Sequence, residues 1–305
     1  ARGGAGKVRL MSTTQTKWGP GVNAEAIQAW DGPLYDRFVR FRHVLIPGLT
    51  PQSEAALRLV EPKAGDRVLD IGCGFGDTTQ RIAELVAPGG EAVGVDAAER
   101  FIETARRDTA EANISNARYL VADVQVSEFE ERFDIAFSRF GTMFFTNPVP
   151  AMRNVCRALV PGGRLAMSVW RRKLDNAWLY RAQQIVEQIV SRPEDYDEPT
   201  CGPGPFSMAD ADTVSEILGY AGFEEIAFHR TDIPVLIGRD VDEAIDMVMA
   251  LGPAGEILRL SGDRATHLHG QVREALHAGL AEYDGPDGVW APASTWVVTA
   301  RRSDG

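Results

Sequence analysis

The chain has 305 residues, of which 44% are apolar and 25% are charged, with a formal net charge of −11 and an isoelectric point near 5.0. An acidic balance of this size argues against a nucleic-acid partner, because binding to a phosphate backbone needs a concentrated basic face. No apolar run approaches the ~18 residues of a membrane-spanning helix. We therefore expect a cytoplasmic protein with no membrane span that acts on a small-molecule substrate. Its oligomeric state stays open, with a homodimer as one candidate.

The first part of the chain, residues 18–62, has the pattern of a helical cap. The opening residues 1–17 are expected to be disordered, and whether residues 1–10, which precede the first methionine, are native stays open. Apolar residues then recur at helical spacing over Asn23–Trp30 and Leu34–Leu45. Pro47 and Gly48 are expected to end the second helix, and Thr50 is expected to cap a third that runs to Val60.

Residues 63–170 alternate between short apolar runs and amphipathic segments. Continuous apolar strands separated by helices indicate a parallel sheet that is covered on both faces. Right-handed crossovers would place the strand carboxyl ends, and hence a ligand crevice, along one edge. The expected strands are Arg67–Ile71, Glu91–Asp96, Arg118–Ala122, Phe133–Ser138 and Arg164–Trp170, and the expected helices are Asp77–Ala87, Ala98–Ala112 and Val149–Leu159.

Beyond Trp170 the alternation changes, and two segments are available as lids or substrate-binding insertions, residues 171–208 and 238–288. Helices are expected over Asp175–Ser191, Ala209–Ala221 and most of residues 241–283, with strands over Phe223–Ile237 and Ser294–Arg301. The pattern thus predicts an α/β fold, a Rossmann-like, seven-stranded, mostly parallel sheet with helices on both faces. Residues 18–301 would form one domain.

A glycine turn follows the first strand of this predicted sheet. Gly72, Gly74 and Gly76 would let the backbone turn sharply and approach a ligand closely, and a helix N-terminus follows directly. A dinucleotide-binding loop has a third glycine at the position that Asp77 occupies here. Asp70 adds a carboxylate before the turn, which a pyrophosphate would not favour.

These residues resemble the motifs of class I S-adenosylmethionine-dependent methyltransferases. The similarity covers residues 60–170 and is closest to the ubiquinone and menaquinone biosynthesis methyltransferases. The segments that carry it are Val68–Gly76, Val93–Asp96, Ala122–Val124, Phe133–Ser138, Ser138–Phe145 and Leu159–Leu165. The resemblance implies S-adenosyl-L-methionine as the cofactor and S-adenosyl-L-homocysteine as the product, and leaves the acceptor open.

The resemblance also implies a role for particular residues at the cofactor. Asp70, Gly72 and Gly74 would line its methionine part, and Asp96 would accept both ribose hydroxyls. The remaining cofactor positions would be Cys73 and Gly76 in the turn, Ala97 after Asp96, Phe101 on the adenine face, Asp123 and Val124 at the adenine edge, and the Ser138 carbonyl at the amino group.

Catalytic residues are not identified by the sequence, because the activated methyl group leaves the protein mainly the task of alignment. Weak candidates for a base or an anion stabiliser are His43, Tyr35, Arg139 and His229. Aromatic residues are expected to border the crevice and to form a lipophilic or aromatic substrate pocket: Trp30, Tyr35, Phe38, Phe140, Phe144, Phe145, Trp170 and Trp178.

A metal site is not expected. Cys73, Cys156 and Cys201 have no metal-like spacing and are interpreted as reduced thiols. His267, His269 and His277 lack suitably spaced cysteine or carboxylate partners, so a solvated helix face is favoured.

Two other functions stay open beside small-molecule methyl transfer. One is a protein that binds S-adenosylmethionine without catalysis and serves a regulatory or partner role, because methyl transfer requires no particular catalytic residue. The other is an NAD(P)-dependent oxidoreductase, which Asp70 and Asp77 disfavour.

Overall fold

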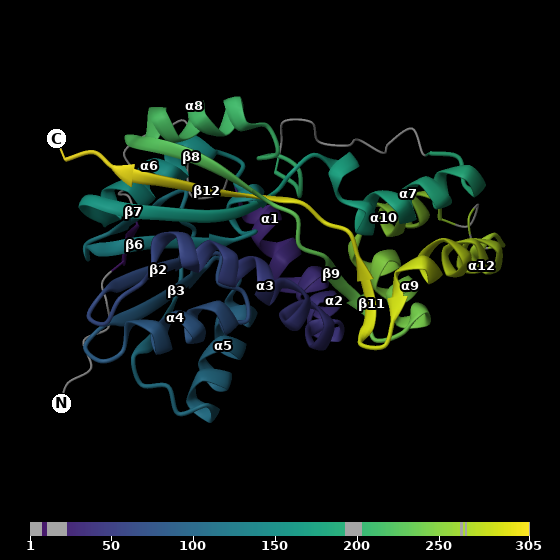
Figure 1. Cartoon of the computed structure of the whole chain (residues 1–305), viewed down its shortest axis with the longest axis horizontal. Coiled ribbons are helices and arrows are strands. Elements are labelled where there is room, and N and C mark those ends of the chain that lie inside the picture. The colour runs from purple at the N-terminus through teal and green to yellow at the C-terminus, as the bar shows by residue number, and fades with distance from the viewer. Residues whose placement is uncertain (1–7, 11–22, 193–202, 263–264, 266, 305) are drawn as a thin grey trace.

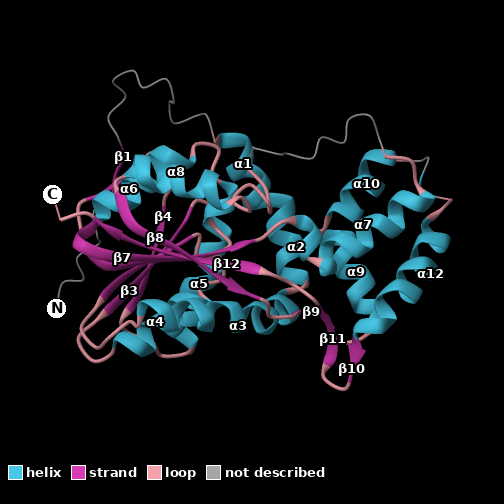
Figure 2. Cartoon of the chain, turned by 45° about the horizontal axis from the view of Figure 1, so that its top comes forward, coloured by secondary structure: helices cyan, strands magenta, loops and turns pink. Residues whose placement is uncertain are grey.

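In a computed structural model, which describes residues 8–10, 23–192, 203–262, 265 and 267–304, a seven-stranded sheet carries helices on both faces (Figures 1 and 2). The strand order is β4-β3-β2-β6-β7-β12-β8. The five strands from β4 to β7 are parallel, and β12 is antiparallel to both of its neighbours. The strands are β2 Arg67–Ile71, β3 Glu91–Asp96, β4 Ala117–Val121, β6 Phe133–Arg139, β7 Leu159–Trp170, β8 Phe223–Thr231 and β12 Thr295–Arg302. The predicted fold class is therefore confirmed.

The two helical layers explain why the central strands are apolar throughout. One face carries α3 (Arg42–Val60), α4 (Asp77–Val86) and α5 (Glu99–Glu111), and the other carries α6 (Pro148–Ala158) and α8 (Ala211–Ala221). On the first face Ile82 of α4 and Leu57 of α3 pack with Val68 and Phe137 of the sheet. Since both faces of each strand are covered, apolar side chains are required on both.

The N-terminal helices differ from the prediction at Pro47. The chain forms α1 (Ala24–Ala29), a π-helical turn (Trp30–Leu34), α2 (Tyr35–Arg40) and then α3, which continues through Pro47 and Pro51 to Val60. The predicted helix end at Pro47 and the predicted cap at Thr50 are wrong.

The local contacts of α3 give the reason for this continuity. The Thr50 hydroxyl donates to the Ile46 carbonyl one turn earlier, at 2.8 Å, instead of capping a new helix. Gly48 packs so closely on β9 (Val235–Gly238) that a Cβ there would lie 2.8 Å from the Leu236 carbonyl oxygen. Packing against the sheet thus outweighs the local helix-ending signal of proline and glycine.

Helices and a small sheet form a second lobe beside the main sheet (Figure 1). The helices are α7 (Ala177–Ile189), α9 (Val241–Leu251), α10 (Pro253–Ser261) and α12 (His269–Leu280), and the small sheet has the order β10-β11-β9. The strands β10 and β11 are Asp284–Gly285 and Gly288–Ala291, and 3₁₀ turns cover Thr142–Phe144, Lys173–Asp175 and Ala281–Tyr283. The two predicted insertions therefore pack together.

The predicted strand Phe223–Ile237 is in fact two strands in different sheets. β8 pairs with β12 in the main sheet, whereas β9 pairs with β11 in the second lobe. Pro234 lies in the gap between them and has no N–H to donate to a ladder.

Another difference from the prediction lies at the N-terminus, within residues 1–17. Val8–Leu10 form β1, which pairs antiparallel with β5 (Ser127–Phe129), so the expected disorder is wrong for these three residues. The rest of that segment lies outside the described residues. Within the described part of the chain, no helix is both long enough and apolar enough to cross a membrane.

Candidate functional site

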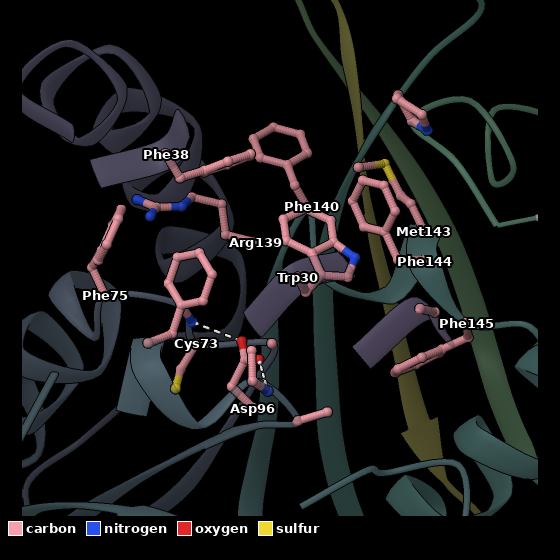
Figure 3. A pocket seen from close by; sticks show the side chains of 18 of the residues that line it. Trp30, Phe38, Cys73, Phe75, Asp96, Arg139, Phe140, Met143, Phe144 and Phe145 are labelled. Atoms are coloured by element: carbon pink, nitrogen blue, oxygen red, sulfur yellow. Dashed lines mark hydrogen bonds between the residues drawn. The ribbon is translucent and has the colours of Figure 1, made fainter. Parts of the chain in front are cut away.

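A cavity of about 300 Å³ opens at the carboxyl ends of the central parallel strands. Its floor comes from the segments after β2, β3, β4 and β6, and its cover comes from α1 to α3 and from α7, α9 and α10 of the second lobe. Figure 3 shows Trp30, Phe140 and Phe144 converging on one space, with Asp96 at the bottom of the view. This edge of an open α/β sheet is where such folds bind ligands.

The glycine turn forms one wall of the cavity through its backbone. Gly72, Gly74 and Gly76 have φ angles of 66°, 51° and 78°, a range that residues with a side chain rarely adopt. A Cβ on Gly72 would lie 2.8 Å from the Cα of Gly141, where the loops after β2 and β6 cross. The residue types in the turn are therefore fixed by backbone geometry, and Gly72 and Gly74 both line the cavity.

Asp96 closes β3 and presents a carboxylate to the cavity. Its Oδ2 accepts a hydrogen bond from the Gly74 N–H at 3.0 Å, and its Oδ1 accepts from the Ala98 N–H, also at 3.0 Å. Burial raises the pKa of Asp96, and these backbone donors oppose that rise. Each carboxylate oxygen has a second acceptor site, so a vicinal diol could still bind both.

Asp123, which follows β4, lies against the first helix of the chain. Its Oδ1 accepts from the Gln125 backbone N–H at 2.9 Å, and its Oδ2 accepts from the Asn23 side-chain amide at 2.6 Å. Asn23 is buried, and its Oδ1 has no partner among the described residues. Both side chains line the cavity, so this end offers two unsaturated oxygen acceptors to a ligand.

Eight of the eleven residues predicted at a cofactor line this cavity, and three do not. The eight are Gly72, Cys73, Gly74, Asp96, Ala97, Phe101, Asp123 and Val124. Gly76 instead packs against Ala105 and Tyr119, and the Ser138 hydroxyl donates to the Ile71 carbonyl at 2.8 Å.

Asp70 is the third of the residues outside the lining. It is 1% exposed, and its Oδ2 accepts from the Thr79 hydroxyl of α4 at 2.6 Å. Burial raises its pKa from 3.8 to about 7, helped by the charges of Asp77 and Asp96 and opposed by Thr79 and Arg139. The carboxylate therefore orders the base of the turn and does not face the cavity.

Of the four predicted catalytic candidates, only Arg139 lines the cavity. Its guanidinium donates to both oxygens of Asp77, at 2.8 and 3.0 Å, and to the Ser53 hydroxyl at 3.1 Å. This bidentate pair joins the end of β6 to the first residue of α4 and fixes the arginine in place.

The other three candidates lie outside the cavity lining, and their contacts explain why. His43 is exposed and pairs with Glu243 at 2.8 Å, and His229 is exposed beside Thr299. The Tyr35 hydroxyl shares a hydrogen bond with Thr104 at 2.6 Å, and its ring packs on Phe101. These placements give no support to a catalytic role for any of the three.

Aromatic rings dominate the other end of the cavity. Phe140 and Trp170 stack with their centroids 4.0 Å apart and their planes 12° apart, and Trp178 lies 5.2 Å from Trp170. Phe140 has a φ of 60°, an uncommon backbone conformation for a bulky residue, and it is held there beside the site. Of the predicted aromatic set, seven residues line the cavity, Trp30, Phe38, Phe140, Phe144, Phe145, Trp170 and Trp178, and Tyr35 does not.

Several lining residues were not predicted from the sequence. Asn23 directly precedes α1, and Met247, Leu251 and Pro253 come from the second lobe. Their positions depend on how distant segments pack together, and periodicity reports only that such residues are apolar. Within the described ranges no cluster of three His, Cys, Asp or Glu side chains could hold a metal ion, and His267, His269 and His277 are exposed. Cys201 lies outside the described residues, and Cys73 and Cys156 are buried free thiols.

Comparison with known proteins adds independent findings. Residues 62–222 match a family model described as a methyltransferase domain. The chain is 34% identical over 148 residues to the aklanonic acid methyltransferase DauC of Streptomyces sp. (strain C5), covering 47% of this chain and 64% of that protein. It is 26% identical over 180 residues to the ubiquinone/menaquinone biosynthesis C-methyltransferase UbiE of Ectopseudomonas mendocina (strain ymp), covering 55% of this chain and 69% of that one.

A solved structure is similar in fold. Phosphoethanolamine N-methyltransferase 2 of Haemonchus contortus, in complex with S-adenosyl-L-methionine, aligns with a TM-score of 0.55 at 20% identity. The alignment covers 92% of this chain and 59% of that chain.

Proposed function

The chain belongs to the class I S-adenosylmethionine-dependent methyltransferases, and from this premise we propose that it transfers a methyl group from that cofactor to a small lipophilic or aromatic metabolite by in-line displacement. The observation that carries the proposal is the two-ended cavity. One end has carboxylates and glycine backbone, and the other has stacked aromatic rings.

The polar end fits the cofactor by the chemistry of its donor and acceptor groups. We assign Asp96 to the ribose hydroxyls, and Asp123, with the unpartnered Oδ1 of Asn23, to the adenine amino group. Gly72 and Gly74 allow the methionine part to approach the backbone. When bound, the cofactor supplies a methyl group that is already activated on a sulfonium sulfur.

The rest of the work falls to residues that orient the acceptor and exclude water. Phe140, Trp170 and Trp178 offer flat faces to a ring, and Met247 and Leu251 enclose it from the second lobe. Holding the acceptor in line with the methyl group removes much of the entropic barrier to the reaction.

The lining has no general base that is free of another partner or role, and this bears on the acceptor. Among the described residues that line the cavity there is no histidine, tyrosine, lysine or glutamate. Of its three aspartates, Asp77 pairs with Arg139, and Asp96 and Asp123 are assigned above to the cofactor. We infer that the acceptor atom ionises readily by itself, as in an acidic phenol or a stabilised carbanion. One relative is named for an acid, aklanonic acid, and another is named as a C-methyltransferase, and both names fit an acceptor that ionises by itself.

A cavity lining without a free general base also fits one alternative, a protein that binds the cofactor without catalysis. A transfer assay with tritiated S-adenosylmethionine separates the two. We expect label in one or more acidic phenols, naphthols or hydroxyquinones and none in guanidinoacetate, with S-adenosylhomocysteine binding at micromolar strength by calorimetry. Binding without turnover across the aromatic panel would favour the non-catalytic protein, and binding of NADH in place of S-adenosylhomocysteine would refute both.

We also propose a cytoplasmic location, which the two buried free thiols support. A nucleic-acid substrate is not proposed, because the chain carries a net charge of −11.

A further inference from the structure

Among the described residues that line the cavity, Arg139 is the one cationic side chain. Three carboxylates line the same space, those of Asp77, Asp96 and Asp123. An acceptor that reacts as an anion, as proposed above, would be repelled by these carboxylates. The donors that Arg139 leaves free therefore bear on where the charge of the acceptor can lie.

The guanidinium of Arg139 uses three of its five N–H donors within the protein. Nη1 donates to the Ser53 hydroxyl at 3.1 Å and to Asp77 Oδ2 at 2.8 Å, and Nη2 donates to Asp77 Oδ1 at 3.0 Å. The Nε–H and the second Nη2–H make no hydrogen bond within the described part of the chain. These two N–H groups are parallel and form one edge of the planar guanidinium, a second fork like the one that holds Asp77.

This free edge of Arg139 can be reached from the cavity. It faces away from α3, because Ser53 lies on the opposite side of the guanidinium. Nε has no hydrogen-bond partner, but unlike the sealed Nε of Arg171 it keeps solvent-accessible surface. The Arg139 side chain is 13% exposed, and Figure 3 shows it running toward Phe75, which also lines the cavity. That accessible surface gives a ligand atom a route to the edge.

Two helices hold the guanidinium in place. Asp77 is the first residue of α4, and Ser53 of α3 is 4% exposed and donates a second hydrogen bond to the Leu49 carbonyl at 3.3 Å. A group that is already ordered loses little further freedom when it binds a ligand. Leu49 lines the cavity with Leu45 and Ile46, so the fork adjoins apolar surface of α3.

We propose that the free edge of Arg139 binds a carboxylate carried by the methyl acceptor, through two parallel N–H···O bonds. The two donors match the spacing of the two carboxylate oxygens, as a guanidinium does in bidentate pairs generally. The next residue, Phe140, belongs to the stacked aromatic wall, so neighbouring positions offer an aromatic acid both a cation and a flat face. This inference rests on the proposed function and deepens it, because it names the acceptor as an aromatic acid and Arg139 as the residue that selects it.

The test uses 2-naphthoate and 2-naphthamide, which have nearly the same shape and differ in charge. Their affinities are measured at neutral pH by equilibrium dialysis against the full chain saturated with S-adenosylhomocysteine. We expect naphthoate to bind the wild type more tightly by roughly 10- to 100-fold, the range of one hydrogen bond to a charged group. In Arg139→Gln this preference should disappear through weaker naphthoate binding, while the affinity of naphthamide changes little.

Arg164→Gln is the matched control, because it removes a partly buried guanidinium that pairs with Asp66 at 3.2 Å outside the cavity lining. This variant should keep the wild-type preference for naphthoate. A wild type without that preference would overturn the proposal. A preference that survives in Arg139→Gln would also overturn it, and so would an equal loss of both ligands, which would assign the arginine to packing alone.

The cofactor has a carboxylate of its own, so a second pair of ligands separates the two sources. S-adenosylhomocysteine and its analogue without the carboxylate, S-(5′-adenosyl)-3-thiopropylamine, are compared by calorimetry. We expect the ratio of their affinities to be the same in the wild type and in Arg139→Gln. A smaller ratio in the variant would assign the edge to the cofactor and overturn the proposal. Failure of S-adenosylhomocysteine to bind the wild type would refute the proposed function itself, whereas a missing naphthoate preference alone refutes only this inference.

A second variant, Arg139→Lys, keeps a cation beside Asp77 if Arg139→Gln does not fold. A lysine ammonium is a point charge and cannot present two parallel N–H groups. We expect the naphthoate preference to fall by about 3-fold or more in Arg139→Lys, because the fork is lost and Asp77 remains the nearer partner. An unchanged preference would show that charge alone is read and would refute the bidentate site.

Discussion

At the scale of the residue, two aspartates near the ends of neighbouring strands have different surroundings and different tasks. Asp96 lines the cavity and is held by two backbone N–H groups, whereas Asp70 lies beneath α4 and is held by Thr79. The sequence motif contains both and cannot separate them, because it does not report which carboxylate α4 covers. Gly72, by contrast, could be predicted from the sequence as a turn glycine. The structure gives the physical reason, because the crossing at Gly141 leaves no room for a Cβ.

The assignment of Asp96 predicts a graded loss of cofactor affinity. Asp96→Ala removes every acceptor and should weaken S-adenosylhomocysteine binding about 100-fold or more, since a hydrogen bond to a charged group contributes about 1.5–3 kcal/mol. Asp96→Asn keeps one oxygen and should fall between the alanine variant and the wild type. Calorimetry gives the affinities, and Asp36→Ala, at an exposed carboxylate that pairs with Arg100, is the control. Wild-type affinity in Asp96→Ala would show that Asp96 does not hold the cofactor.

Asp70 predicts a pH dependence of stability. Its pKa is about 7 in the fold against 3.8 for the free side chain, chiefly because of burial. Between about pH 4 and pH 7 the folded chain keeps this proton and the unfolded chain releases it, so the contribution of Asp70 to the free energy of unfolding falls as the pH rises. Asp70→Asn removes this titration, and its stability relative to the wild type should be greater at pH 8 than at pH 5 by a few kcal/mol.

Urea unfolding at the two pH values measures that difference. Asp212→Asn, which changes an exposed carboxylate on α8, is the control and should show no such difference. If Asp70→Asn changes the stability equally at pH 5 and pH 8, the buried carboxylate does not titrate in this window.

At the scale of the element, β2, β3, β4 and β6 could be predicted to within about one residue, whereas β7 begins at Leu159 and not at the predicted Arg164. In the cap and second lobe the helices could be predicted, but the way in which segments join could not. β2 and β3 have continuous apolar sequences that end in a turn signal, so local pattern and tertiary role agree. In α3 the local pattern and the tertiary role disagree. Pro47 predicts a helix end, but packing of Gly48 on β9 keeps the helix continuous. The division of Phe223–Ile237 into β8 and β9 likewise depends on which sheet each half joins. Non-local pairing of this kind leaves little trace in periodicity.

At the scale of the whole molecule, the cap and the second lobe close over the cavity and are joined by ion pairs. Arg40 of α2 pairs with Asp246 of α9 at 2.7 Å, and His43 of α3 pairs with Glu243 of the same helix at 2.8 Å. Hydrogen bonds from Arg239 and from His43 lower the pKa of Glu243 to about 2, and burial opposes this shift. Residues on both sides of this junction line the cavity, so we expect a ligand the size of the cofactor to enter or leave most readily when the junction opens.

This arrangement predicts that the Arg40–Asp246 pair affects opening more than global stability. Exposed pairs contribute about 0–1 kcal/mol, so Arg40→Ala should leave the free energy of unfolding nearly unchanged. Amide exchange in α2 and α9 should nevertheless rise by up to about 5-fold, because the lost energy is concentrated in the opening step. Arg259→Ala is the matched control, since it breaks an exposed pair with Glu256 inside α10. Raising the salt concentration to about 1 M should bring the wild type toward Arg40→Ala, as screening weakens the pair. Equal exchange in the two variants would mean that the cap and the lobe are held by apolar packing and that the ion pairs have no part in closure.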